Sequence, residues 1–150
     1  RNAERLASCL VESSRLYARR RSKTGSAHDD FSPWEEQYIA PRAGGPYPGK
    51  VAVLTNRSTY SAANAFAQMA RVAPRAILVG DRSGGGGGTP AYGELPNGWT
   101  YRFSATQSVS PLGEHLEFGV PIDLPAALTP EDEQAERDGI IEKALEWLGG

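Results

Sequence analysis

The sequence predicts an α/β domain built around a mostly parallel sheet. Two short apolar runs, residues 51–54 and 76–79, have the length and composition of buried strands. An alanine-rich helix is predicted between them, over residues 61–71. A strand, a helix and a second strand in this order favour a right-handed crossover and parallel pairing. The 150 residues fit one domain or a fragment of one, and 39% hydrophobic residues suffice for a packed core.

Composition and charge exclude several function classes. The net charge of −2 argues against binding nucleic acid by charge alone. A single cysteine, Cys9, excludes an internal disulfide framework and a multi-cysteine metal site. No apolar run approaches the roughly 18 residues of a membrane span. We therefore expect no nucleic-acid partner, no membrane span in this chain, and neither a metal nor a cofactor.

The sequence of the N-terminal third predicts one helix followed by a long loop. Leu6, Leu10 and Tyr17 give a rough helical stripe that predicts a helix over residues 3–17. The arginines and lysine from Arg15 to Lys23 then read as the basic C-terminal end of that helix, with an anion site as the alternative. Residues 22–49 are rich in glycine and proline and predict a long loop with one short strand or turn around 36–39.

The C-terminal half alternates turns and short elements. The run 84–88 is pure glycine and reads as a flexible linker, since no Gly-Lys-Ser/Thr ending follows to suggest a phosphate loop. Asn97-Gly98 predicts a hairpin turn, followed by a strand over 99–104 with one aromatic face. Residues 117–123 predict an extended segment. A helix over 140–148 closes the chain, with Asp138 as its N-cap and an earlier start near 129–131 as the alternative.

Ser61 is the residue best placed for chemistry. It stands where a predicted buried strand ends and a helix begins, which is the edge at which α/β proteins bind ligands. Free backbone N–H groups and the helix dipole at that position would stabilise an oxyanion. Ser58, Thr59 and Ser61 are equally suited to cap the helix, so the residues alone leave both roles open.

Five segments in a fixed order carry a family resemblance: residues 50–56, Ser61-Ala62-Ala63, Val79-Gly80-Asp81, Leu95-Pro96-Asn97-Gly98 and Gly119-Val120-Pro121-Ile122-Asp123. Together, over roughly residues 1–148, they resemble the C-terminal processing, or tail-specific, serine peptidases. The resemblance implies a Clp-protease/crotonase-like core of layered β-β-α units. It predicts that residues 1–150 are the C-terminal part of the catalytic domain, with its N-terminal strands upstream of Arg1.

The resemblance also assigns roles to individual residues. It makes Ser61 the nucleophile of a serine-type endopeptidase and gives the backbone N–H of Ala62 to the oxyanion hole. In the better-known branch a lysine acts as the base, but its position aligns with Gly86, so a Ser–Lys dyad is not supported here. A tricorn-type branch uses a histidine that lies upstream of this chain and an orienting acid, which corresponds to Glu117. His28 and His115 are interpreted as surface residues.

Three function classes follow from these observations. The first is a serine peptidase domain that hydrolyses a polypeptide substrate, held as an added strand near an exposed edge or the 99–106 ribbon. The second is a non-catalytic member of the same fold that binds a peptide or a hydrophobic ligand, and the third is an interaction domain. The resemblance implies an extracytoplasmic setting: periplasmic, envelope-anchored or secreted. An open sheet edge would favour a homo-oligomer.

Overall fold

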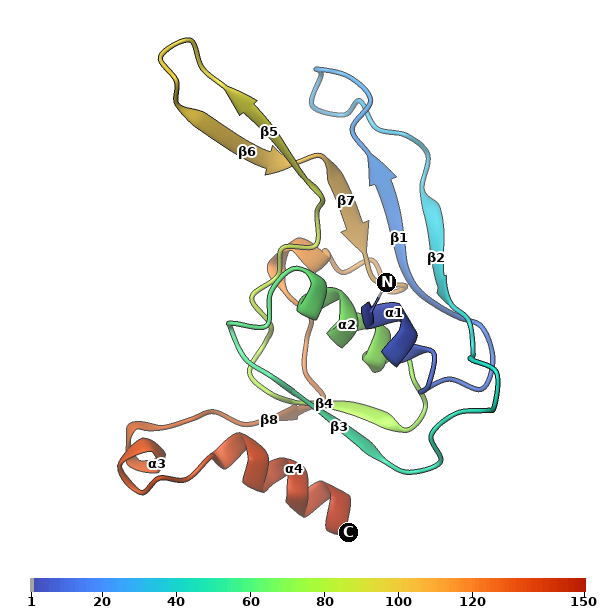
Figure 1. The fold of residues 1–150 in the computed structure, drawn as a ribbon, viewed down its shortest axis with the longest axis vertical. Helices are drawn as coiled ribbons and strands as arrows, with labels where there is room; N and C mark the ends of the chain where they lie inside the picture. Colours follow the sequence, from blue (N-terminus) through green and yellow to red (C-terminus); the bar gives the residue numbers. More distant parts are fainter. Residues whose placement is uncertain (1) are drawn as a thin grey trace.

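The computed structural model describes residues 2–150 and arranges them as three small sheets, two of which pack beside helix α2 while the third projects away from it (Figure 1). The helices are α1 (Asn2–Ala7), α2 (Ala62–Arg71), the 3-10 turn η1 (Leu116–Phe118), α3 (Pro130–Gln134) and α4 (Gly139–Gly149). The strands are β1 (Arg15–Ser22), β2 (Glu35–Ile39), β3 (Val51–Thr55), β4 (Ala76–Gly80), β5 (Pro90–Glu94), β6 (Thr100–Ser104), β7 (Thr106–Val109) and β8 (Leu124–Pro125).

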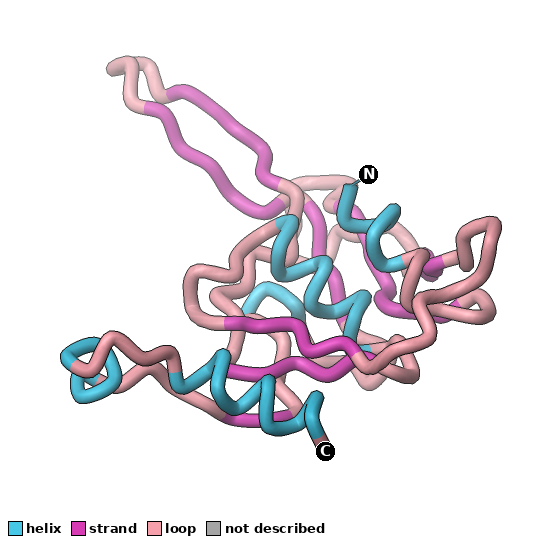
Figure 2. Tube along the Cα trace, turned by 60° about the horizontal axis from the view of Figure 1, so that its bottom comes forward, coloured by secondary structure: helices cyan, strands magenta, loops and turns pink. Residues whose placement is uncertain are grey.

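The parallel sheet has the order β3-β4-β8 and confirms the predicted strand-helix-strand unit. Val51 pairs with Ala76 and Thr55 with Gly80, so both strands end at the same edge. Helices α2 and α4 cover opposite faces of this sheet (Figures 1 and 2). The α2 side holds the core, in which Ala67, Ala70 and Leu78 are fully buried. Burial of this apolar face supplies the main driving force for the fold.

The predicted helix over 3–17 is wrong beyond its first two turns. Helix α1 ends at Ala7, and residues from Arg15 form strand β1, which pairs antiparallel with β2 on one side and β7 on the other. Intrinsic helix propensity contributes little free energy per residue, so the pairing of β1 with both β2 and β7 decides the conformation of this segment. The pairing also buries Tyr17 and Ala18 against α2, where the Gln68 Nε2 atom donates to the Tyr17 carbonyl at 2.8 Å.

The basic cluster is not a helix end, because Arg15–Ser22 forms strand β1. Arg19 contacts Glu36 at 3.5 Å, and Arg21 donates to Gln107 at 2.9 Å. The Arg21 guanidinium also stacks between the rings of Phe31 and Trp34. These contacts link β1 to β2, to β7 and to the loop between β1 and β2. Strand β2 confirms the strand alternative predicted at 36–39.

Strands β5 and β6 form a hairpin that projects from the body of the protein (Figures 1 and 2). The predicted turn at Asn97-Gly98 is confirmed: Gly98 has φ +83°, and Trp99 N donates to Asn97 Oδ1 at 3.2 Å. Tyr101 and Phe103 stack on one another with ring centroids 6.3 Å apart. Both side chains are about half exposed, so the hairpin presents apolar surface to its surroundings.

The segment before β8 is more compact than the predicted extended stretch. Residues Leu116–Phe118 form a single 3-10 turn, because Leu116 is buried in the core while Glu117 and Phe118 face outward. Gly119 with φ +91° then redirects the chain, and Asp123 accepts from Leu78 N at 2.8 Å as β8 joins the parallel sheet. This turn places Glu117 beside the glycine run.

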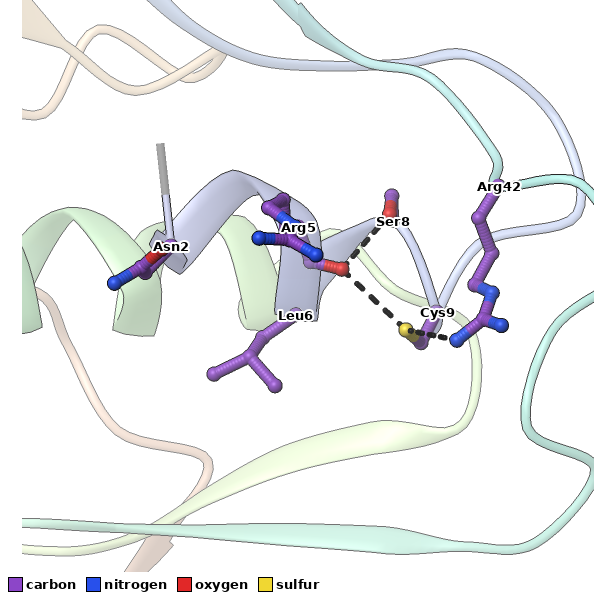
Figure 3. Close-up of a pocket in the computed structure, with 6 residues that line it drawn as sticks. All are labelled: Asn2, Arg5, Leu6, Ser8, Cys9 and Arg42. Atoms are coloured by element: carbon purple, nitrogen blue, oxygen red, sulfur yellow. Dashed lines mark hydrogen bonds between the residues drawn. The ribbon is translucent and has the colours of Figure 1, made fainter.

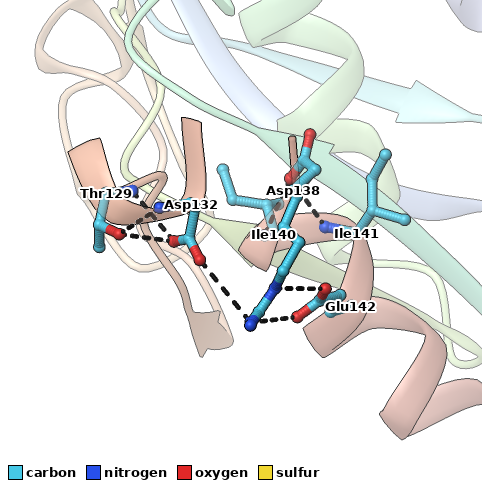
Figure 4. A network of polar contacts seen from close by, with 7 residues as sticks. Thr129, Asp132, Asp138, Ile140, Ile141 and Glu142 are labelled. Atoms are coloured by element: carbon cyan, nitrogen blue, oxygen red, sulfur yellow. Dashed lines mark hydrogen bonds and ion pairs between the residues drawn. The ribbon is translucent and has the colours of Figure 1, made fainter. Parts of the chain in front are cut away.

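Both predicted helix starts near the C-terminus are used (Figure 4). Thr129 and Asp132 form a capping box at α3, and Asp138 Oδ1 accepts from Ile140 N and Ile141 N at the start of α4. Arg137 bridges Asp132 and Glu142 between the two helices. The Thr129 hydrogen bonds lower the pKa of the Asp132 carboxyl. Within residues 2–150, no helix is both long and apolar enough to cross a bilayer.

Replacing Asp138 by Ala is expected to lower the free energy of unfolding by about 1 kcal/mol, because two N–H groups at the start of α4 lose their acceptor. The Asp138→Asn variant keeps an acceptor oxygen and should stay within a few tenths of a kcal/mol of the unaltered protein. Urea denaturation followed by circular dichroism measures both. Equal stability of the Ala variant and the unaltered protein would contradict this role.

A second expected outcome concerns acid stability. The Arg71 hydrogen bond at 2.6 Å, assisted by Ser110, lowers the pKa of the Glu114 carboxyl. The ionised carboxylate therefore stabilises the fold above the unfolded pKa of about 4.3 and loses this effect as the pH falls through the lowered folded value. The stability gap between the unaltered protein and Glu114→Gln should shrink from about pH 6 to about pH 3.

The matched control for this titration is Glu35→Gln, whose carboxylate makes no hydrogen bond or ion pair with any residue in the described range. Its stability gap should vary less with pH than that of Glu114→Gln. A gap for Glu114→Gln that stays constant, or widens on acidification, would contradict the assigned ion pair.

Candidate active site

Ser61 lies in the connection from β3 to α2, at the carboxyl edge of the parallel sheet. The turn before it is satisfied internally, since Ser58 N donates to Asn56 Oδ1 and Asn56 N to Thr59 Oγ1. An ion pair of 2.8 Å between Arg57 and Asp81 joins the ends of β3 and β4. The Arg57 hydrogen bond lowers the pKa of the Asp81 carboxyl. The connection that presents Ser61 is thus firmly held.

The backbone of Ser61 is strained. Its φ of 55° and ψ of −114° fall in a region that residues with a side chain rarely adopt. Such a conformation costs about 1–3 kcal/mol and is concentrated at functional sites. Hydrogen bonds from Ser61 N to Gly85 O and from Ala65 N to Ser61 O, each 2.9 Å, fix it in place. The conformation resembles the sharp strand-to-helix turn that exposes a nucleophilic serine in α/β hydrolases.

The Ser61 side chain does not cap helix α2. It makes no capping hydrogen bond, and the residue is exposed. The neighbouring Ala62 N–H has no acceptor anywhere in residues 2–150, although Ala63 N donates to Tyr60 O at 3.1 Å. A free hydroxyl therefore stands beside a free N–H at the positive end of a ten-residue helix. Of the two roles left open by the sequence, capping is excluded by this geometry.

The glycine run is a packed loop, so its interpretation as a flexible linker is wrong. Gly85 and Gly86 have φ of +87° and +75°, and Gly86 N donates to Glu117 O at 3.1 Å. A Cβ atom would collide with the Glu117 carbonyl at position 85 and with the Tyr60 ring at position 86. Glycine is required here because the loop passes directly against two neighbouring segments.

A buried polar network ties the site together. The Ser83 hydroxyl donates to Asn64 Oδ1 at 2.6 Å and accepts from Val120 N at 2.6 Å. Asn64 Nδ2 donates to Leu116 O at 3.0 Å. Asn64, Ser83 and Val120 are fully buried. The network joins the first turn of α2, the start of the glycine run and the 3-10 turn that carries Glu117.

Ser61 and Glu117 open onto one cavity of about 200 Å³. The glycine loop and the base of the β5–β6 hairpin complete its lining, through Tyr60, Gly86, Gly88, Pro90, Arg102, Phe103 and Ser104. The Glu117 carboxylate accepts from Gly88 N at 2.8 Å and from Ser104 Oγ at 3.2 Å. The structure thus places in one cavity the two residues that the family resemblance assigned to catalysis, although they lie 56 positions apart in the chain.

Neither a lysine nor a histidine is among the residues that line this cavity. At position 86, where one branch of the resembling peptidases has a lysine, a side chain would meet the Tyr60 ring. His115 lines a neighbouring cavity of about 330 Å³, which shares Ser104 and Glu117 with the first, and its ring packs against Phe118. His28 lies in the β1–β2 connection and lines neither cavity. Residues 2–150 contain no cluster of His, Cys, Asp or Glu suited to a metal ion.

A larger cavity of about 650 Å³ lies beside α1 (Figure 3). Its lining includes Cys9, whose sulfur accepts a 3.4 Å contact from the Arg42 guanidinium and raises the pKa of that group. The lining also includes Arg5 and Ser8, and it shares no residue with the Ser61 cavity. No carboxylate or imidazole lines it, and we assign no reaction to it.

Sequence reasoning missed Asn64, Ser83 and Arg102. Asn64 had a usable signal, because a polar residue within an alanine-rich apolar helix requires a buried partner. The sequence around Ser83 and Arg102 carries no such signal, because the positions of these residues depend on the path of the glycine loop and of the β5–β6 hairpin.

Comparison with known proteins agrees with this architecture. The sequence pattern of peptidase family S41 matches residues 2–126. A candidate peptidase from Parabacteroides merdae has 40% sequence identity and a TM-score of 0.91, over 97% of this chain and 46% of that protein. Mature CPAF complexed with lactacystin has 16% identity and a TM-score of 0.75, over 98% and 39%. The photosystem II D1 C-terminal processing protease has 19% identity and a TM-score of 0.58, over 99% and 35%.

The last two similarities concern the fold alone. The chain spans less than half the length of each of these three structures. No curated protein sequence matches it significantly.

The Ser83→Ala variant is expected to lose about 2–4 kcal/mol of stability, because Val120 N–H and Asn64 Oδ1 are left buried without partners. Urea denaturation measures this loss. The exposed loop residue Ser26 gives a matched control, and Ser26→Ala should stay within about 0.5 kcal/mol of the unaltered protein. Similar small effects of both variants would refute the importance of the network.

Proposed function

The chain belongs to peptidase family S41, and we propose that it carries the nucleophile, Ser61, of a serine-type endopeptidase that cleaves polypeptides. The observation that carries this proposal is the strained Ser61 backbone, with a free hydroxyl beside the unpaired N–H of Ala62. Strain of this kind persists only where the surrounding structure enforces it, and a nucleophile needs such enforced exposure.

The proposed reaction is acyl transfer. Ser61 Oγ attacks the scissile carbonyl carbon, its proton passes to a base, and the carbonyl electrons move to the oxygen. The Ala62 N–H donates to this oxyanion, assisted by the positive end of α2. Collapse of the intermediate expels the amine of the leaving peptide, which takes up the proton. Water then attacks the acyl-serine ester, releases the acid product and regenerates the hydroxyl.

We propose that the base is supplied by residues outside 1–150, a histidine in the tricorn-type branch of the resemblance, with Glu117 as the acid that orients it. Glu117 faces the same cavity as Ser61. Its two oxygens accept from Gly88 and Ser104, and each retains a lone pair for an imidazole N–H. Position 86, which aligns with the lysine of the better-known branch, is glycine in this chain, so that residue supplies no lysine base.

The polypeptide substrate is proposed to bind as an added strand along the β5–β6 hairpin. This two-stranded ribbon has open edges and its base, at Pro90 and Phe103, lines the Ser61 cavity. The exposed rings of Tyr101 and Phe103 offer apolar contact to alternate substrate side chains. A tail-specific preference and an extracytoplasmic location follow from the resemblance to C-terminal processing peptidases, and self-association through open edges such as β3 is a further expectation.

An active-site-directed fluorophosphonate should label Ser61 in the full-length protein, as read by peptide mass spectrometry. The Ser61→Ala variant should lose labelling, and its peptide hydrolysis should fall by about three orders of magnitude or more. Ser58 is an exposed serine three residues earlier in the same turn, so Ser58→Ala serves as the matched control and should retain both. Peptide hydrolysis that persists in Ser61→Ala would overturn the assignment, and binding without any turnover would favour a non-catalytic, ligand-binding member.

A further inference from the structure

Arg102 is the one basic residue among those that line the Ser61 cavity. It lies on β6 between Tyr101 and Phe103, paired across the hairpin with Tyr92. It is exposed, and it lines the same cavity as Ser61 together with its neighbours Phe103 and Ser104. The hairpin therefore carries a positive charge into the space where a substrate would meet the proposed nucleophile.

Beyond the backbone pairing of β5 with β6, the Arg102 side chain has no partner within residues 2–150: its guanidinium makes no hydrogen bond, ion pair or ring contact there. Other arginines around the site are engaged. Arg57 pairs with Asp81 at 2.8 Å, and Arg82 donates to the carbonyls of Phe118 and Gly119 at 2.8 and 3.3 Å.

Glu117, the carboxylate that lines this cavity, forms no ion pair with Arg102. Both oxygens of Glu117 are held by other donors, Gly88 N and the Ser104 hydroxyl. The Arg102 guanidinium is thus available to a bound ligand, while Glu117 keeps its orientation without it.

We propose that Arg102 recognises a carboxylate of the peptide substrate close to the scissile bond. This inference rests on the proposed peptidase function. A guanidinium binds a carboxylate through two parallel, charge-assisted hydrogen bonds, which a neutral amide cannot match. The negative charge of Glu117 in the same cavity favours a singly charged carboxylate over a dianion. The carboxylate comes from an Asp or Glu side chain or from the substrate C-terminus.

Matched peptides test this recognition in the full-length protein. One pair differs only by Glu or Gln next to the cleaved bond, and each peptide is made with a free or an amidated C-terminus. The acidic peptide should be cleaved with about tenfold higher kcat/KM, carried by a lower KM, and the preference should weaken as salt rises. If the higher kcat/KM requires Glu, Arg102 binds a side-chain carboxylate. If it requires the free C-terminus, Arg102 binds the terminal carboxylate.

Variants of Arg102 must change this preference. Arg102→Gln should bring the ratio of the two kcat/KM values close to one, Arg102→Glu should invert it, and Arg102→Lys should keep part of it. Arg15, an exposed arginine on β1 that does not line the cavity, provides the control Arg15→Gln, which should keep the full ratio.

Binding to the Ser61→Ala protein separates this inference from the proposed reaction. Fluorescence anisotropy with the same labelled peptides should show the same preference for the carboxylate, and Arg102→Gln in that background should remove it. Equal affinity for acidic and neutral peptides, or a preference that survives Arg102→Gln, would overturn the inference while leaving Ser61-dependent hydrolysis intact. Absence of hydrolysis by the full-length protein with Ser61 intact, while the binding preference is retained, would overturn the peptidase function instead.

Discussion

One buried hydroxyl, that of Ser83, connects the three segments that build the site. It bonds to Asn64 in the first turn of α2 and to the backbone of Val120, while Asn64 bonds to the carbonyl of Leu116. Each of these groups is buried, and each has its partner, so the network specifies one arrangement rather than merely adding stability. Because these segments lead to Ser61, the glycine loop and Glu117, their relative positions depend on this network.

The network supports a strained nucleophile. Ser61 adopts a positive φ, and its N–H is held by Gly85 of the loop that Ser83 anchors. Energy stored in this turn is offset by the surrounding bonds and burial, which is how strained residues persist at functional sites. The result is preorganisation: the hydroxyl and the Ala62 N–H are in place before a substrate arrives, so little rearrangement is needed at the moment of reaction.

Local signals made part of this structure predictable. The apolar runs flanking an alanine-rich helix, the Asn97-Gly98 turn and the Asp138 cap each depend on neighbours in sequence, and each prediction is confirmed. The strand from Arg15 was missed because its partners, β2 and β7, lie far along the chain. The packing of Gly85 and Gly86 was missed because glycine carries no signal for what approaches it. The meeting of Ser61 and Glu117 could be expected only from family resemblance, since residue types alone favoured a capping role for Ser61.

A structure of the full-length protein with a peptide boronate bound tests the central claim most directly. The account predicts continuous density from Ser61 Oγ to a tetrahedral boron, with one boronate oxygen accepting a hydrogen bond from Ala62 N–H and with Ser61 still at positive φ. A boronate attached to another residue, or an oxygen turned away from Ala62 while Ser61 relaxes to an unstrained backbone, would contradict it.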